Sequence, residues 1–210
     1  MHTRTKTLTA LAAAAVGVVL VAGCSDGGSD TSMEGHSMGS STAMESSAES
    51  ADPAAAFNDA DVMFATMMYP HHAQAVEMAD MVEGRTTNPD VIALADEIAA
   101  AQQPEMDQLT SWLSQWGQPA PSSDASSMEG MDHGSGGGMM TAQDMESLMT
   151  ASGADFDRQW LTMMIEHHRG AVEMAEKEIA DGENTDAVAM ARTIVETQNA
   201  EISRMQQLLG

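Results

Sequence analysis

A double-histidine motif occurs twice in this chain, and methionines precede and follow each copy. The first copy reads Met-Met-Tyr-Pro-His-His and the second Met-Met-Ile-Glu-His-His. Two residues after each copy, an Ala-Val-Glu-Met-Ala run begins. Thioether sulfurs favour soft ions such as Cu(I) and Ag(I), and imidazole binds copper in either oxidation state. The motif therefore predicts a copper site, with silver as a second candidate ion. Its candidate ligands are Met67, Met68, His71, His72, Met78, Met163, Met164, His167, His168 and Met174.

A structural role for the same motif is equally compatible with these helical residues alone. On a helical wheel, His71 lies at the centre of an apolar, Met-rich face, and such a stripe commonly fills a protein core. His72 and His168 lie at the flank, a position compatible with exposure to solvent. Buried polar groups need partners, which would be one another, water or an ion. The further polar side chains expected in the bundle core are Gln102, Glu105, Gln198 and Glu201.

Methionine and histidine also cluster in two segments that have no periodic apolar face. Both segments are rich in Ser, Gly and Ala, so we expect them to be disordered, and packing offers no reason for their methionines. A flexible Met/His cluster can wrap a soft cation. Oxidant scavenging through methionine sulfoxide and the absence of any function are the alternatives. The weaker ligand candidates in these segments are Met33, His36, Met38, Met128, Met131, His133, Met139 and Met140.

The motif belongs to a duplicated unit of two helices. Residues 156–209 align without a gap to residues 60–113, and roughly a third of the aligned positions are identical. Asn88-Pro89-Asp90 has the residue types preferred at an N-cap, at position N1 and in a first helical turn, and Asn184-Thr185-Asp186 repeats this pattern. The predicted helices are 59–82, 89–116, 154–180 and 185–208, with a short extra helix from about Thr141 to Gly153.

Two helix pairs with short turns predict an all-α, four-helix bundle. Pro70 and Pro104 interrupt their helices in this interpretation and predict kinks. The expected organisation is a signal peptide (1–23), a disordered tether (24–56), a first helical pair (57–117), a Met/His-rich linker (118–140) and a second helical pair (141–210), with the two pairs forming one bundle.

The N-terminus has the features of a lipoprotein signal peptide. A short basic region precedes an apolar run of about 15 residues, which is too short to span a membrane. The run ends in Leu-Val-Ala-Gly-Cys, which is typical of a bacterial lipobox, so we expect cleavage before Cys24 and lipidation of its sulfur. An ordinary secretory signal is the alternative. The expected location is the outer face of the cell membrane, on a lipid anchor at Cys24.

Composition excludes several function classes. The chain has 8 basic and 32 acidic residues and a formal net charge of -24, which excludes a protein that binds nucleic acid through a cationic surface. Its one Cys cannot build a thiolate cluster. No Glu-x-x-His pair of a di-metal carboxylate enzyme occurs in the helical units, only Glu105 and Glu201 are expected to face inward, and no nucleophile–base arrangement is apparent. We therefore expect no enzymatic activity.

The repeated His-His and Ala-Val-Glu-Met-Ala elements, each followed by Ile-x3-Gln-x2-Glu, resemble the bacterial family called domain of unknown function 305. The resemblance implies a ferritin-like helical bundle in an exported protein, and some members of the family are linked to copper binding and resistance. The chain departs from the pattern by Ile202 where the first copy has Met106, and by its long Met/His linkers. The motif positions carried over, with their first-copy equivalents, are Asp157, Met163, Met164, His167, His168, Met174, Gln198 and Glu201.

The sequence thus favours an extracytoplasmic lipoprotein that binds or buffers copper-like ions. In this hypothesis the flexible Met/His segments capture the ion and the double-histidine helices hold it. Its expected partners are metal ions and the membrane, but no nucleic acid. An envelope scaffold without metal and, less favoured, a di-metal enzyme are the alternatives.

Overall fold

The structure is a computed structural model that describes residues 56–122 and 137–210. The predicted signal peptide, Cys24 and the tether up to residue 55 lie outside the described residues, and so does the linker from 123 to 136. Six of the weaker ligand candidates therefore lie outside the described residues as well: Met33, His36, Met38, Met128, Met131 and His133.

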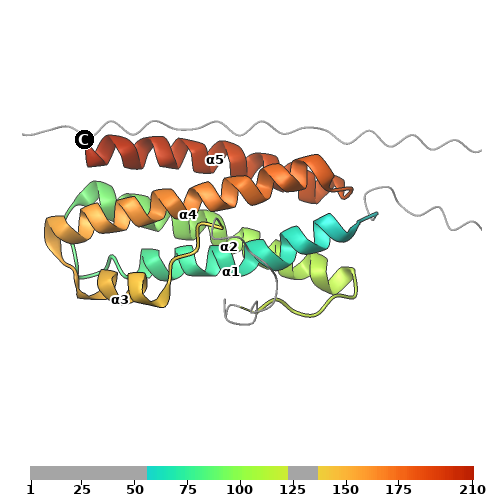
Figure 1. The fold of residues 1–210 in the computed structure, drawn as a ribbon, viewed down its shortest axis with the longest axis horizontal. Helices are drawn as coiled ribbons and strands as arrows, with labels where there is room; N and C mark the ends of the chain where they lie inside the picture. The colour runs from blue at the N-terminus through green and yellow to red at the C-terminus, as the bar shows by residue number, and fades with distance from the viewer. Residues whose placement is uncertain (1–55, 123–136) are drawn as a thin grey trace, which may run out of the picture. The chain divides into compact units, whose positions relative to one another are not determined.

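Four long helices and one short helix make up the described part, which contains no strand (Figure 1). The helices are α1 (Asp59–Asp80), α2 (Pro89–Gln115), α3 (Ala142–Thr150), α4 (Gly153–Asp181) and α5 (Thr185–Leu209). The predicted all-α fold is confirmed, and each long helix begins and ends within two residues of its predicted bounds.

Side-chain caps explain why the helices begin where they do. Asn58 accepts hydrogen bonds from the backbone N–H groups of Ala60 and Asp61, and the Asp61 carboxylate accepts the N–H of Asn58 in return. The side chain of Asn88 accepts the N–H of Asp90 at the start of α2, and that of Asn184 accepts those of Asp186 and Ala187 at the start of α5. These contacts satisfy N–H groups that the first turn of a helix leaves without partners.

The two helix pairs of the duplicated sequence pack as two hairpins. α1 packs on α2 and α4 packs on α5, while α1 also contacts α4, and α3 contacts α4 (Figure 1). α1 continues through Pro70 and α2 continues through Pro104, as the predicted bounds of both helices imply. A proline removes one backbone hydrogen bond of a helix, and the kinks expected at these two positions stay a prediction.

Two apolar clusters fill the interior, and every long helix crosses from one to the other through a polar stretch. On α1, Met68 belongs to one cluster and Ala75 to the other, with the histidines between them. On α4 the crossing falls between Ile165 and Ala171. The side chains at the four crossings, here called the polar layer, are His71, His72, Gln102, Glu105, His167, His168, Gln198 and Glu201.

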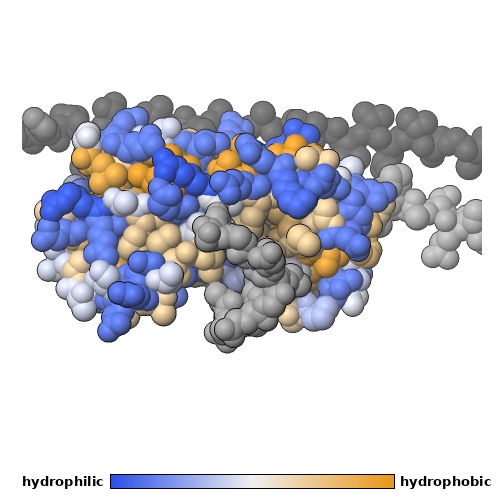
Figure 2. All heavy atoms as spheres, in the orientation of Figure 1, coloured by the Kyte–Doolittle hydropathy of each residue, from blue (hydrophilic) through white to orange (hydrophobic). Residues whose placement is uncertain are grey.

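The described helices do not have the composition of membrane spans. Among residues 56–122 and 137–210, no helix is both long enough and apolar enough to cross a membrane. On the face drawn in Figure 2, hydrophilic residues cover most of the described surface and apolar residues interrupt them in small groups.

Candidate metal site

All four motif histidines lie inside the bundle. The exposed fraction of each side chain is between 0% and 2%. The expected position of His72 and His168 at a solvent-exposed flank is therefore wrong, since both are completely buried. The reason is tertiary, because α2 covers the flank of α1 and α5 covers the flank of α4.

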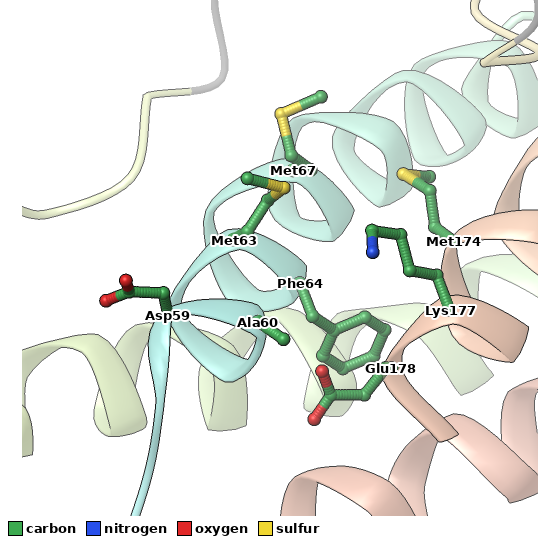
Figure 3. Close-up of a pocket in the computed structure, with 8 residues that line it drawn as sticks. All are labelled: Asp59, Ala60, Met63, Phe64, Met67, Met174, Lys177 and Glu178. Carbon is green, nitrogen blue, oxygen red and sulfur yellow. The ribbon is translucent and has the colours of Figure 1, made fainter. Parts of the chain in front are cut away.

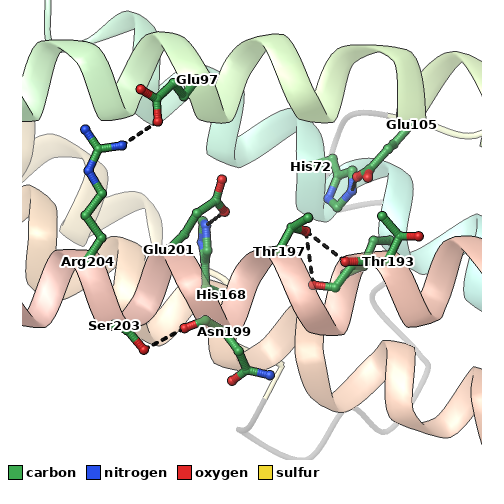
Figure 4. Close-up of polar contacts among 11 residues, drawn as sticks. His72, Glu97, Glu105, His168, Thr193, Thr197, Asn199, Glu201, Ser203 and Arg204 are labelled. Atoms are coloured by element: carbon green, nitrogen blue, oxygen red, sulfur yellow. Dashed lines mark hydrogen bonds and ion pairs between the residues drawn. The ribbon is translucent and has the colours of Figure 1, made fainter.

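Two of these histidines are held by glutamates of the neighbouring helix. His72 Nε2 donates to Glu105 Oε2 at 2.7 Å, and His168 Nε2 donates to Glu201 Oε2 at 2.8 Å (Figure 4). A carboxylate only accepts, so the shared proton belongs to Nε2, and a neutral ring then keeps a lone pair on Nδ1. Both Nδ1 atoms are buried and have no partner. Carboxylate–histidine pairs of this kind commonly orient metal ligands.

The other two histidines face each other at the centre of the polar layer. The ring centroids of His71 and His167 are 3.8 Å apart, with the ring planes tilted by 39°. His71 Nε2 donates to the carbonyl oxygen of Gly137 at 3.0 Å. The other three ring nitrogens of this pair are buried without a hydrogen-bond partner. Such groups are costly to leave unpaired, by about 1–3 kcal/mol each, and they commonly mark a site for water or an ion.

A short segment of the predicted linker closes over this pair. Residues 137–140, here called the strap, run across α1 and α4. The Gln74 amide donates to the carbonyl oxygen of Met140 at 2.9 Å and accepts its N–H at 2.7 Å. Gly170, the counterpart of Gln74 in the second copy, allows the strap to approach, since a Cβ there would lie 2.2 Å from the Gly137 carbonyl oxygen. The two copies thus differ at one position so that α1 binds the strap and α4 makes room for it.

The burial of the central pair keeps both rings neutral. Desolvation, and then the nearby ring of His72, lower the pKa of His71 to about 3. Desolvation, and then His71 itself, hold the pKa of His167 well below its ordinary value. Burial disfavours the charged form because the interior solvates it poorly. Both rings are therefore neutral near pH 7, which is the state in which imidazole binds a metal.

The structure separates the candidate methionines into two groups. Met68, Met78, Met163 and Met164 belong to the apolar clusters and are buried. Met67 and Met174 are partly exposed and line a surface pocket together with Met63, which the motif did not mark (Figure 3). The expectation that packing cannot explain the linker methionines is wrong for Met140, because it packs against an apolar cluster. Met139 is partly buried in the strap.

The buried polar groups of the helices are only partly those that the sequence marked. Gln102 and Gln198 are each 3% exposed, and the side-chain oxygen of each lacks a partner. Glu178 is 1% exposed, so the expectation that only Glu105 and Glu201 face inward is wrong. Val82 stands at the equivalent position of the first copy, and repeat matching therefore passed over Glu178. A helical wheel would have found it, because eleven residues after His167 the same face recurs.

Glu178 lies against the carboxyl group of Asp61. Desolvation, and then a hydrogen bond with Asp61, raise the pKa of Glu178 to about 8. Burial opposes ionisation of Asp61 as well, yet the bond from Glu178 and backbone N–H groups, including that of Asn184, hold its pKa below the ordinary value. Glu178 is therefore the member of the pair that keeps its proton near pH 7. Asp61 also accepts the Asn184 N–H at 2.9 Å, which ties α1 to the turn before α5.

The donor set decides which metals fit. Among the described residues, no three His, Cys, Asp or Glu side chains converge in a way that would hold an ion. The candidate donors that the described residues offer are neutral imidazoles and, on the same helices, thioethers, and soft ions accept both kinds of ligand.

Comparison with known proteins identifies relatives of the chain. The family described as a domain of unknown function (DUF305) matches residues 61–209. A crystal structure of a DUF305 protein from Streptomyces coelicolor, described as a predicted secreted protein, is 38% identical with a TM-score of 0.64, covering 71% of this chain and 91% of that one. A DUF305 fragment from Deinococcus radiodurans is 32% identical with a TM-score of 0.64, covering 73% of this chain and 97% of that one. No curated protein matches the chain.

A third similar structure carries a metal. CopM in its Cu(II)-bound form is 32% identical to this chain with a TM-score of 0.60, and the match covers 71% of this chain and 95% of CopM. CopM is also known in Cu(I)-bound, Ag-bound and apo forms.

Proposed function

Because the chain belongs to the domain of unknown function 305 family, we propose that it binds copper-like soft ions, copper or silver, in its helical bundle. The ion is cargo that the protein holds or buffers, and we propose no enzymatic reaction. Relatives support the choice of ion, since CopM, which is 30–32% identical, binds Cu(II), Cu(I) and Ag.

One observation carries this proposal. The ring centroids of His71 and His167 lie 3.8 Å apart in the middle of the bundle, and three of the four ring nitrogens lack a protein partner. A purely structural polar layer would be expected to satisfy its own groups. The neighbouring glutamates orient His72 and His168 so that two further nitrogens stay available. Neutral, oriented imidazoles beside methionines are suited to copper and silver.

We propose in addition that the protein acts outside the cytoplasm on a lipid anchor at Cys24. The lipobox-like sequence and the basic, apolar leader support this location. The Streptomyces coelicolor relative is also described as a predicted secreted protein. Mass spectrometry of Cys24 in the membrane fraction would test the anchor, and an unmodified, soluble chain would contradict it.

Metal analysis of the full chain tests the binding function. The protein is exposed to Cu(I), Ag(I), Zn(II) or Fe(II), freed of unbound ion, and measured by inductively coupled plasma mass spectrometry. We expect stoichiometric copper and silver but neither zinc nor iron. The His71→Ala/His167→Ala variant is expected to lose at least one equivalent of the bound ion.

A matched variant separates ligand loss from damage to the core. Gln102→Leu/Gln198→Leu removes two buried polar groups of the same layer, at equivalent positions of the two copies, without removing a soft ligand. It should keep the full metal content. Equal loss in both variants, or no copper or silver bound by the unmodified chain, would contradict the proposal and leave the polar layer a structural network.

A further inference from the structure

A methionine-lined pocket opens beside the N-terminal half of α1 and the C-terminal half of α4. It has a volume of about 360 Å³, and its lining is mainly apolar. Three of its lining residues carry thioethers, namely Met63 and Met67 from α1 and Met174 from α4 (Figure 3). Met63 is 50% exposed, so a solute can reach this sulfur without opening the fold.

The spacing on α1 connects this pocket with the buried histidines. Met63, Met67 and His71 are four residues apart in turn, so they share one face, and each step advances about 6 Å along the helix. Exposure falls along this row from 50% at Met63, through a partly buried Met67, to 2% at His71. On α4, Met174 and His167 are seven residues apart and share a face in the same way. The two helices that line the pocket thus carry the central histidine pair farther along the same faces, one turn beyond Met67 and two turns from Met174.

The duplication gives the molecule a second groove equivalent to this pocket, formed by the other ends of α1 and α4, and α3 fills that groove. The residues equivalent to Met63, Met67 and Met174 are Gln159, Met163 and Met78. There α3 covers the groove, since its Met145 and Leu148 join the same apolar cluster as Met78 and Met163. Gln159 also bonds Ser147 of α3 at 2.8 Å. Among the described residues, no helix takes the place of α3 at this pocket, and Met63 stays exposed.

The charges around the pocket do not prevent a cation from binding. The Lys177 ammonium group lines the pocket but pairs with Asp181 at 2.5 Å. Asp59 also lines it, and the chain has a formal net charge of -24, which raises the local cation concentration. Thioethers are poor ligands for hard divalent ions and good ligands for soft monovalent ones.

From these observations we infer that Met63, Met67 and Met174 form a capture site for Cu(I) or Ag(I), from which the ion reaches His71 and His167. This inference rests on the proposed soft-metal function and adds to it a second site, the monovalent charge of the ion and a direction of transfer. The ion keeps its charge throughout, and no redox step is involved.

Methionine methyl signals can show where the ion binds. The full chain is labelled with ¹³C-methyl methionine and titrated with silver nitrate, and the signals are assigned by single Met→Leu variants. We expect Ag(I) to shift the signals of all three pocket methionines at the first equivalents. Met63→Leu/Met174→Leu, which keeps the apolar volume, should lose one equivalent of Ag(I) and the shift at Met67.

Met149→Leu is the matched control, because Met149 is 47% exposed on α3 and lies outside the pocket. This variant should keep the full Ag(I) content and all three pocket shifts. Pocket signals that stay unmoved while the chain binds Ag(I) elsewhere would overturn the capture site alone. Failure of the chain to bind Ag(I) at all would overturn the proposed function and the capture site together. If the pocket signals still shift in His71→Ala/His167→Ala, the capture site is supported. If that variant also retained all its other bound silver, the histidine site would be contradicted, but the capture site would not.

Discussion

Each of the two flanking histidines, His72 and His168, is oriented by a hydrogen bond to a single carboxylate. Glu105 and Glu201 are about one-fifth exposed, whereas the histidines that they contact are fully buried. The glutamates therefore act from the edge of the bundle, and they fix which ring nitrogen carries the proton. Loss of such an orienting partner typically lowers metal affinity by about 10–100-fold.

Replacing both carboxylates should weaken metal binding without removing a ligand. Glu105→Gln/Glu201→Gln keeps the shape of the side chains but lets the amide donate as well as accept, so the protonated nitrogen is no longer fixed. We expect copper affinity to fall by about 10–100-fold, measured by competition with a Cu(I) chelator. Glu97→Gln, which alters an exposed partner of Arg204, is the control. Unchanged affinity in the double variant would show that His72 and His168 bind no metal.

Burial in the folded protein disfavours the ionised form of Glu178. Its pKa is raised to about 8 from an ordinary value of 4.5. Between these pH values the native state keeps a proton that the unfolded state has released. The associated stability is therefore complete below about pH 4.5 and is lost as the pH rises through 8.

The Glu178→Gln variant should be less sensitive to alkaline pH than the unmodified protein. The amide can still donate to Asp61 but does not ionise. We expect the melting temperature of the unmodified metal-free protein to fall between about pH 5 and pH 9 by more than that of the variant. Thermal unfolding followed by circular dichroism measures this difference. Glu173→Gln, on the exposed side of α4, should behave like the unmodified protein, and an identical decline in Glu178→Gln would rule out the carboxyl pair as its cause.

At the scale of elements, the strap joins chain segments that are far apart in sequence. It contacts α1 through His71 and Gln74, and it lies on α4 at Gly170. Gly138 has a φ of +71°, a conformation that glycine adopts without the steric cost of a Cβ. The glycines of the strap thus let the backbone place the carbonyl oxygen of Gly137 where it accepts a hydrogen bond from the buried His71.

Gly170→Ala should displace the strap, whereas Gly137→Ala should not. The added Cβ at Gly170 would lie 2.2 Å from a backbone oxygen, but nothing lies within 4 Å of one at Gly137. Overpacking of this kind costs about 1–3 kcal/mol. We expect a corresponding loss of unfolding free energy in urea and faster hydrogen exchange of the Met140 amide in Gly170→Ala alone. Equal protection of that amide in the two variants would contradict the described contact.

At the scale of the whole molecule, the polar layer makes the fold sensitive to acid. The folded-state pKa of His71 is lowered to about 3 and that of His167 also lies far below 6.5. Unfolded chains take up these protons near pH 6.5, while the native state does not. The stability that neutral histidines contribute is therefore present above pH 6.5 and is lost as the pH falls toward 3.

Urea denaturation of the metal-free protein should show this acid sensitivity. We expect the unfolding free energy to decrease between about pH 6.5 and pH 4.5. The measurement is best made in Glu178→Gln, since the Glu178 proton acts in the opposite direction over this range. His71→Phe/His167→Phe in the same background should have a shallower pH dependence. A pH-independent unfolding free energy in Glu178→Gln would exclude neutral buried histidines.

Helix positions could be predicted closely because their causes are local. Asn58, Asn88 and Asn184 cap helices through contacts within three residues, and such contacts leave a readable pattern in sequence. α1 continues through Pro70 within the predicted bounds of the helix, although a proline removes one backbone hydrogen bond.

The amino-acid sequence alone determined the duplicated helix pairs, the double-histidine motif and the types of side chain from which a soft-metal site could be built, since periodicity and side-chain type express these directly. Only the tertiary structure decided that His72 and His168 are buried, that His71 meets His167, and that Met63 joins Met67 and Met174 in one pocket. It also revealed Glu178, whose counterpart in the first copy is a valine. These features depend on which helices cover one another, and contacts between segments far apart in the chain leave no periodic trace in either segment.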